Sequence, residues 1–256
     1  EEHAELESIK DDPKEIESRF FGPLEFGTAG LRGTMYTGLH NMNNQVIRWA
    51  TQGFANVIAA EGEDAKKKGV AICMDCRNNN MLFSHAAAEV CAANGIHVRI
   101  FDSLRPTPEL SFAVREYGCQ AGINVTASHN PKEYNGYKVY GADGCQITTQ
   151  AAAEILAEIE KLDIFADVKH SAFETDIANG TVRYIPDDVY TAFVQEVKSQ
   201  SVLFGEEVNR NVAIVYSPLN GTGLKPVTRT LKEMGYTNIT VVPEQEKPDG
   251  HFPTCP

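Results

Sequence analysis

The sequence lacks the features of membrane, secreted and nucleic-acid-binding proteins. No apolar run approaches the roughly 18 residues of a membrane-spanning helix. The acidic start, EEHAELESIKDDPKE, matches neither a signal peptide nor an Arg-rich transit peptide. With 23 Lys and Arg against 35 Asp and Glu, the net charge is -12, so a general surface for phosphate backbones or anionic lipids is not expected. We therefore expect a cytoplasmic protein without nucleic-acid or membrane partners.

A cysteine framework is also missing. The six cysteines are scattered through apolar segments, which is typical of reduced thiols rather than of a small disulfide scaffold. Cys73 and Cys76 form a C-x-x-C pair, but no second C-x-x-C or H-x-x-x-H supplies the further ligands of a zinc site. We interpret this pair as a coincidence at the end of a strand.

Strands and helices alternate in the first half of the chain. The apolar run VAICM (70–74) precedes a helix expected at 81–94, which leads to the strand IHVRIF (96–101). A second helix, with Thr107 as its N-cap, leads to the strand CQAGINV (119–125). This order predicts an α/β fold with a mixed, mostly parallel sheet sandwiched by helices.

Three loops follow the carboxyl ends of these predicted strands, the edge at which ligands bind in parallel sheets. They span residues 75–79, 102–108 and 126–136. The last of them, TASHNPKEYNG, carries Ser128. The serine is therefore predicted to lie where chemistry is expected.

The second half of the chain begins another unit. A hairpin turn is expected at Asp143-Gly144 and a surface helix at 148–162, whereas the stretch up to residue 184 follows no clear pattern. From residue 186 we expect, in order, a helix (187–200), the strand NVAIVYS (211–217), a helix (223–234) and the strand ITVV (239–242). The chain is thus predicted to contain one domain at 1–185 and the opening of a second, similar α/β domain at 186–256.

The surroundings of Ser128 favour phosphate chemistry over acyl transfer. A nucleophilic or phosphate-carrying serine needs exposure, positive charge and a proton acceptor, and His129, Lys132 and Lys138 follow closely in the sequence. The serine lies in neither G-x-S-x-G nor S-x-x-K, so a serine hydrolase is the weaker alternative. His129 could face the same ligand as Ser128 only if the chain makes a tight turn there.

A second glycine-rich segment, EFGTAGLRGTM, surrounds Arg32. Its glycines, at 27, 30 and 33, match neither nucleotide-binding fingerprint. Such a loop can still bring backbone N–H groups and a guanidinium close to a phosphate. Arg77 and Arg105, in the other two edge loops, are expected to be surface or helix-capping charges.

Several segments together identify a resemblance. FGTAGLRGTM, SLRPTPEL, GINVTASHNPKEYNGYKVYGADG and VYSPLNGTG resemble the α-D-phosphohexomutase superfamily, and most of all its phosphoglucomutase and phosphopentomutase branch. The resemblance covers nearly the whole chain. Its most specific part is TASHNP followed by NGYK.

The resemblance implies a phosphosugar mutase. Ser128 would be the phosphoserine, Arg32 and Lys138 cationic and acid/base groups, and His129 and Asn130 further contacts to phosphate. It also implies Mg²⁺ bound by the phosphate on Ser128, with a sugar 1,6-bisphosphate as intermediate and activator. The substrate would be a small phosphosugar, first glucose 1-phosphate and glucose 6-phosphate, with pentose or mannose phosphates as alternatives.

The sequence departs from the family's pattern at the metal loop. The family holds its metal with three aspartates in D-x-D-x-D-R, and no D-x-D occurs in these 256 residues. The chain also lacks a starting Met, and its last residues, KPDGHFPTCP, complete no element. We therefore expect an N-terminal fragment that is inactive alone. A non-catalytic sugar-phosphate-binding domain remains the alternative class.

Overall fold

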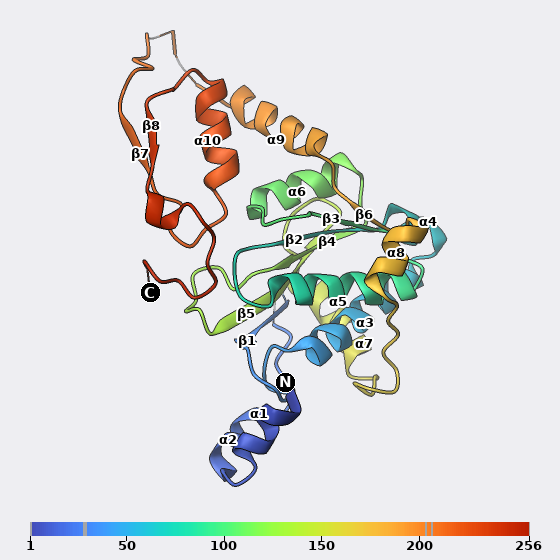
Figure 1. Cartoon of the computed structure of the whole chain (residues 1–256). Coiled ribbons are helices and arrows are strands. Elements are labelled where there is room, and N and C mark those ends of the chain that lie inside the picture. The colour runs from blue at the N-terminus through green and yellow to red at the C-terminus, as the bar shows by residue number, and fades with distance from the viewer. Residues whose placement is uncertain (1, 28–29, 203, 206, 256) are drawn as a thin grey trace.

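A six-stranded sheet organises the first part of the chain (Figure 1). The computed structural model describes residues 2–27, 30–202, 204–205 and 207–255. The strand order is β1-β5-β4-β2-β3-β6, in which β2, β3, β4 and β6 are parallel and β5 pairs antiparallel with β4 and β1. The strands are β1 (Gly30–Thr34), β2 (Val70–Met74), β3 (Val98–Ile100), β4 (Ala121–Val125), β5 (Tyr134–Gly141) and β6 (Val182–Tyr184). The predicted mixed, mostly parallel sheet is confirmed.

Helices cover both faces of this sheet (Figure 1). The alternation in β2 shows the two layers, because Ile72 belongs to the core under α3 and α5, whereas Cys73 belongs to the core under α6. The helices of this part are α1 (Glu2–Ile9), α2 (Pro13–Phe20), α3 (Asn44–Ala60), α4 (Glu63–Lys68), α5 (Asn80–Ala93), α6 (Thr107–Glu116), α7 (Thr149–Ile159) and α8 (Phe173–Asn179). None of the helices in the described ranges is long and apolar enough to cross a membrane.

Two details differ from the sequence-based expectation. The N-cap of α6 is Pro106 rather than Thr107, because the Thr107 hydroxyl accepts a hydrogen bond from Asn124 Nδ2 at 2.8 Å and not from the helix's own amides. The stretch before residue 184, for which no pattern was found, contains α8 and the edge strand β6. β6 has only three residues, too few for a period to appear.

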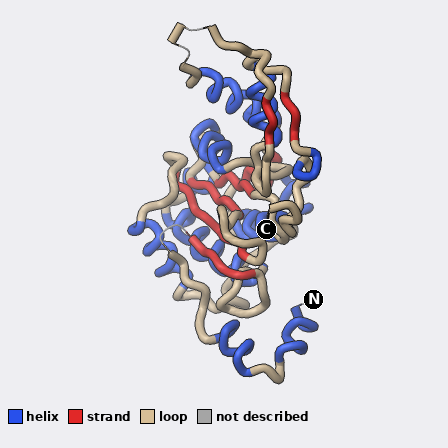
Figure 2. The backbone as a smooth tube through the Cα atoms, turned by 90° about the vertical axis from the view of Figure 1, so that its left-hand side faces the viewer, coloured by secondary structure: helices blue, strands red, loops and turns tan. Residues whose placement is uncertain are grey.

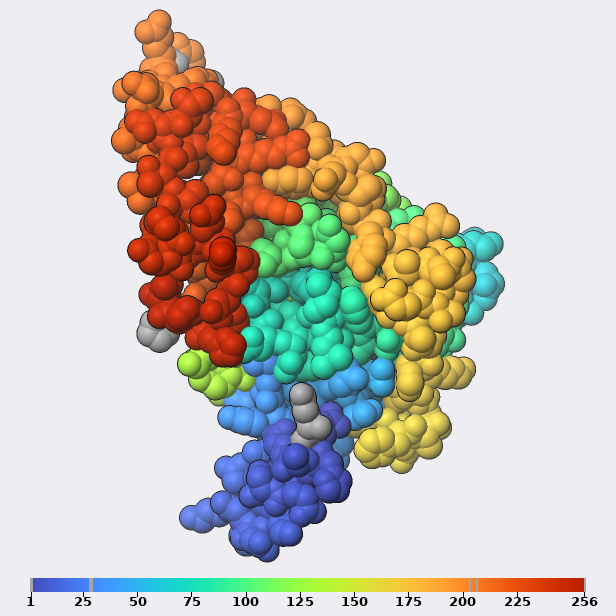
Figure 3. Space-filling model, viewed as in Figure 1, coloured from blue at the N-terminus to red at the C-terminus, as the bar shows by residue number. Residues whose placement is uncertain are grey.

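The second unit has the predicted order of elements. It consists of α9 (Asp187–Ser199), β7 (Ile214–Tyr216), α10 (Leu224–Glu233), β8 (Ile239–Val241) and the short 3₁₀ helix η1 (Pro243–Gln245). β7 and β8 form a two-stranded parallel sheet. This unit contacts the loop that follows β2 through Asn220 and Cys76. The unit and the projecting helices α1 and α2 lie at opposite ends of the molecule (Figures 2 and 3).

The buried centre of the sheet dominates stability. We expect Ile123→Ala, at a fully buried position of β4, to lower the free energy of unfolding by about 2–5 kcal/mol, because it removes apolar contacts and leaves a cavity. The matched change Ile16→Ala, on the projecting α2 where the side chain is 38% exposed, should cost much less. Denaturant unfolding of both variants measures the difference. Equal losses would contradict this assignment of the core.

Candidate active site

Ser128 lies in a tight turn directly after β4. Its φ of 58° is in the left-handed region, which is uncommon for a residue with a side chain. The turn places Ser128 Oγ 3.4 Å from His129 Nδ1, and both side chains are exposed. The predicted condition for two neighbouring side chains to face one ligand is therefore met.

Two polar side chains, those of Thr126 and Asp75, support the backbone of the serine. The Ser128 amide donates to Thr126 Oγ1 at 3.0 Å, and that hydroxyl donates to Asp75 Oδ2 at 2.5 Å. Asp75 follows β2, so two adjacent parallel strands supply this support. Burial raises the pKa of the Asp75 carboxyl, while the hydrogen bonds from Thr126 and from the Arg77 amide oppose that rise.

Arg77 lies inside the serine loop rather than on the surface. Only 4% of the residue is exposed, and its two terminal nitrogens donate to four backbone carbonyl oxygens of the loop. Arg105 is equally buried, with its Nε 3.2 Å from Glu109 Oε1. The expectation of surface or helix-capping charges was wrong for both arginines. Arg77 donates to backbone carbonyl groups of the loop, and Arg105 pairs with the buried carboxylate of Glu109.

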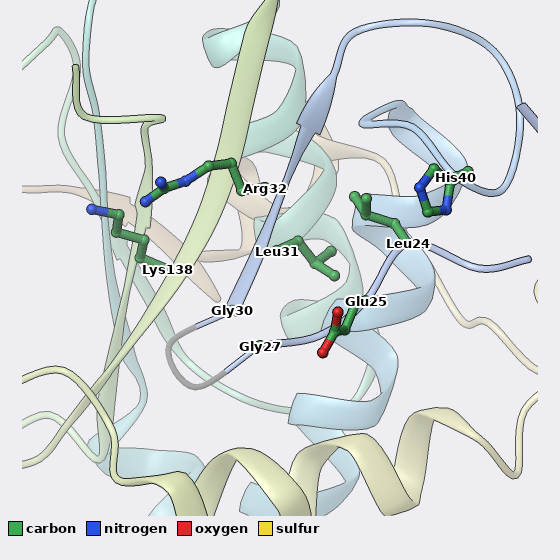
Figure 4. A pocket seen from close by; sticks show the side chains of 8 residues that line it. All are labelled: Leu24, Glu25, Gly27, Gly30, Leu31, Arg32, His40 and Lys138. Carbon is green, nitrogen blue, oxygen red and sulfur yellow. The ribbon is translucent and has the colours of Figure 1, made fainter. Parts of the chain in front are cut away.

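Arg32 and Lys138 lie side by side on neighbouring strands. In the antiparallel pair β1/β5, Arg32 is opposite Gly136 and Lys138 is opposite Gly30, so the two side chains are diagonal neighbours on one face (Figure 4). Leu31 points to the other face and is buried. Across the β1/β5 pair, the residue opposite each cation is a glycine, which carries no side chain.

An open pocket of about 470 Å³ adjoins these cations. Its lining residues are Leu24, Glu25, Gly27, Gly30, Leu31, Arg32, His40 and Lys138. The glycine-rich segment therefore meets the NGYK segment, although Thr28 and Ala29 of its turn lie outside the described residues. Partial burial lowers the pKa of Lys138, and the positive charge of Arg32 lowers it further.

A smaller polar pocket of about 130 Å³ is lined in part by Ser128. Residues of the second unit close it, since it is lined by Asp75, Arg105, Thr107, Asn124, Thr126, Ser128, Asn220, Gly221 and Thr222. The Cys76 thiol donates to the carbonyl oxygen of Asn220 at 2.9 Å, so this cysteine contacts the second unit. Ser128 thus lines a pocket to which both units contribute residues.

Sequence reasoning did not single out the polar groups under the loop. Asn135, fully buried, donates to Asn80 Oδ1 at 2.5 Å, and Asn80 donates to Asp75 Oδ1 at 2.5 Å. Asn130, expected to bind phosphate, is half-buried, and its carbonyl oxygen accepts from Arg77 at 2.6 Å. The buried Asn135 within the quoted NGYK segment was the available signal, because an amide inside a strand needs partners.

Comparison with known proteins agrees with this arrangement. The family described as phosphoglucomutase/phosphomannomutase, alpha/beta/alpha domain I, matches residues 23–164, and the corresponding domain II matches residues 189–256. The chain belongs to the phosphoglucomutase/phosphomannomutase family. These matched ranges are compatible with two domains, while the boundary at residues 185 and 186 stays a prediction.

Relatives in this family carry two activity names. The chain is 36% identical to a phosphoglucomutase of Staphylococcus saprophyticus over 94% of this chain and 43% of that protein. It is 32% identical to a phosphomannomutase of Mycoplasma pneumoniae over 89% of this chain and 40% of that protein. The chain therefore spans less than half the length of these relatives.

Solved structures show the same fold. A Thermus thermophilus protein matches with a TM-score of 0.72 at 22% identity, over 90% of this chain and 48% of that one. A phosphoglucomutase/phosphomannomutase family protein of Burkholderia thailandensis matches with a TM-score of 0.66, also at 22% identity, over 90% and 45% of the two chains. The family fold is thus found in this chain.

The two neighbouring cations should titrate together. We expect Arg32→Met to raise the pKa of Lys138, because removing the adjacent positive charge makes protonation of the ammonium less costly. NMR titration of the Lys138 side chain measures this shift. Arg183→Met, which removes an exposed charge from β6, should leave the pKa of Lys138 unchanged. A lower or constant pKa in Arg32→Met would contradict the coupling.

Proposed function

We propose that the protein containing this chain is a phosphosugar mutase that carries its phosphate on Ser128. The favoured reaction interconverts glucose 1-phosphate and glucose 6-phosphate through glucose 1,6-bisphosphate. Mannose phosphates, named in one group of relatives, and pentose phosphates are the alternative substrates. The observation that carries the proposal is the exposed Ser128 at the sheet edge of a family member, at the end of the strand that pairs with β5, which bears Lys138.

The proposed reaction has two phosphoryl transfers. In the first, the bond between Ser128 Oγ and phosphorus breaks, a sugar hydroxyl oxygen bonds to phosphorus, and the hydroxyl proton passes to a base. After the bisphosphate turns round, its other phosphate returns to Ser128, and the sugar oxygen released takes a proton. Charge neutralisation and positioning supply most of the rate acceleration in such transfers.

The cationic residues suit this chemistry. Arg32 offers an exposed guanidinium for phosphate oxygens, and Lys138, whose pKa is lowered, is better able to donate and accept a proton than an ordinary lysine. His129 lies within 3.4 Å of Ser128 Oγ and can contact the same phosphate. Asn130 supports the loop through its backbone carbonyl, which accepts a hydrogen bond from Arg77.

Magnesium is a proposal for the whole protein and not for this chain. Within the described ranges, no group of three or more His, Cys, Asp or Glu side chains is placed to hold a metal ion. Asp75, near Ser128, already accepts hydrogen bonds on both carboxylate oxygens. A phosphate on Ser128 would offer hard oxygen ligands of the kind that Mg²⁺ prefers, but the described residues around it do not form a metal site by themselves.

The modification of Ser128 tests the proposal. Mass spectrometry of the full-length protein after incubation with glucose 1,6-bisphosphate should find one added phosphate on Ser128. Ser128→Ala should take up no phosphate and lose mutase turnover, by at least the roughly 10⁴-fold typical when a nucleophile is removed. Ser201→Ala, an exposed serine after α9, should behave as the unchanged protein. A protein that turns over sugar phosphates without a phosphate on Ser128 would contradict the mechanism.

The alternative is a sugar-phosphate-binding domain without catalysis. It is favoured for the isolated chain by the missing metal donors in the described part of the structure. Calorimetric titration with glucose 1-phosphate, beside turnover assays of this chain and the full-length protein, separates the two. Binding without turnover by this chain, and turnover by the longer protein, is the expected pair of results.

A further inference from the structure

The carbonyl groups of the serine loop converge on one guanidinium. Arg77 Nη1 donates to the carbonyl oxygens of Pro131 at 2.7 Å and Tyr134 at 2.9 Å. Its Nη2 donates to those of Ser128 at 3.2 Å and Asn130 at 2.6 Å. The four N–H bonds of the two terminal nitrogens are therefore matched by four acceptors. A single side chain thus contacts four carbonyl groups of this loop.

The guanidinium is enclosed on its remaining sides. Its Nε lies 3.5 Å from Asp75 Oδ2, and its plane lies near the ring of Phe252, whose centroid is 5.1 Å from Cζ. Phe252 belongs to the last segment of the chain and is itself buried. Arg77 is thus occupied by protein groups and is not available to bind a phosphate directly.

Inward carbonyls imply outward amides. In a planar trans peptide the C=O and the following N–H point in opposite directions, and the described residues contain no cis peptide. Because the Ser128 carbonyl points to Arg77, the N–H of His129 points away from it; the same holds for Pro131 and Lys132. Neither amide has a backbone acceptor among the described residues. Among the described residues, both N–H groups of this loop are therefore free to donate to a ligand.

We propose that Arg77 is a positioning residue that shapes a phosphate site at Ser128. By binding the four carbonyl groups, it keeps Ser128 in its left-handed conformation and turns the N–H groups of His129 and Lys132 toward the phosphoryl oxygens. The ligand is the phosphate of a phosphomonoester, carried on Ser128 or arriving with the sugar. This inference rests on the proposed function, because it assigns Arg77 a part in the phosphoryl transfer.

The test compares Arg77→Lys with Arg99→Lys in the full-length protein. A lysine at 77 keeps the charge but cannot reach four carbonyls in one plane. The same change at Arg99 on β3, whose guanidinium lies over Tyr117, affects a site away from the loop. The protein is phosphorylated with glucose 1,6-bisphosphate and mixed with excess glucose 1-phosphate, and the single-turnover rate constant is measured at several concentrations.

We expect Arg77→Lys to lower this rate constant by roughly 100-fold, as a misplaced reacting group does. The half-saturating concentration should stay within about twofold, because Arg32 and Lys138 on β1 and β5 still meet the sugar phosphate. A rate constant, unlike an amplitude, does not depend on the folded fraction. Hydrogen exchange should be faster at Ser128, Asn130 and Tyr134, whose amides are bonded within the loop. Arg99→Lys should change none of these.

A second variant covers the case in which Arg77→Lys fails to fold. Phe252→Leu keeps the four hydrogen bonds and removes the aromatic cover, so a reduction of the rate constant by about 2- to 5-fold is expected. An unchanged rate constant in Arg77→Lys, or in Phe252→Leu where the lysine variant does not fold, would overturn the inference. So would a slower transfer without faster loop exchange.

Failure of the proposed function gives a different result. In that case the unchanged protein takes up no phosphate on Ser128, whichever residue stands at 77. The exchange measurement still reports whether Arg77 orders the loop. Faster loop exchange in a protein that cannot be phosphorylated would therefore overturn the mutase and the catalytic part of this inference, and leave the loop contact in place.

Discussion

The site depends on the partly buried carboxylate of Asp75, which is hydrogen-bonded through both of its oxygens. Asp75 Oδ1 accepts from the Arg77 amide at 2.9 Å and from Asn80 Nδ2 at 2.5 Å, and Oδ2 accepts from Thr126 at 2.5 Å. A buried polar group left without a partner costs about 1–3 kcal/mol, and more if it is charged. Thr126 can therefore hold Ser128 only while Asp75 holds Thr126. Parallel pairing of β2 and β4 makes this possible, since it brings both strand ends to one edge.

The second unit adds to the same edge from the other end of the chain. Asn220 accepts from the Cys76 thiol and donates to the carbonyl oxygen of Cys255 at 2.7 Å, so three distant segments meet beside the serine loop. Gly250 approaches Asn78 so closely that a Cβ would lie 2.3 Å from its Oδ1. A larger residue at this position would therefore force Asn78 or the segment around Gly250 to move. The environment of Ser128 is thus built by both units.

The sequence was informative where burial is regular and uninformative where contacts are specific. Apolar runs predicted β2 and β4, and the strand ends correctly placed Ser128 at the carboxyl edge of the sheet, because both follow from periodicity and sheet geometry. Thr107 was wrongly expected to cap its helix, since nothing local reveals that Asn124 binds its hydroxyl. Arg77 was expected to be a surface or helix-capping charge because its acceptors are backbone carbonyl groups of residues 128–134. Every residue type has a backbone carbonyl, so the sequence does not show which ones bind an arginine.

Arg77 and Arg32 show that a buried arginine and an exposed arginine have different roles in this structure. Arg77 is buried, its terminal N–H groups donate to carbonyl groups of the serine loop, and its charge is balanced by Asp75. Its role is therefore to support the conformation of the loop. Arg32 is exposed on β1 beside Lys138, and both face glycines across the strand pair, so they contribute charge. A protein of net charge -12 repels anions over most of its surface. Under the proposed function, the local pair of cations Arg32 and Lys138 would favour the binding of an anionic substrate on this face of the sheet.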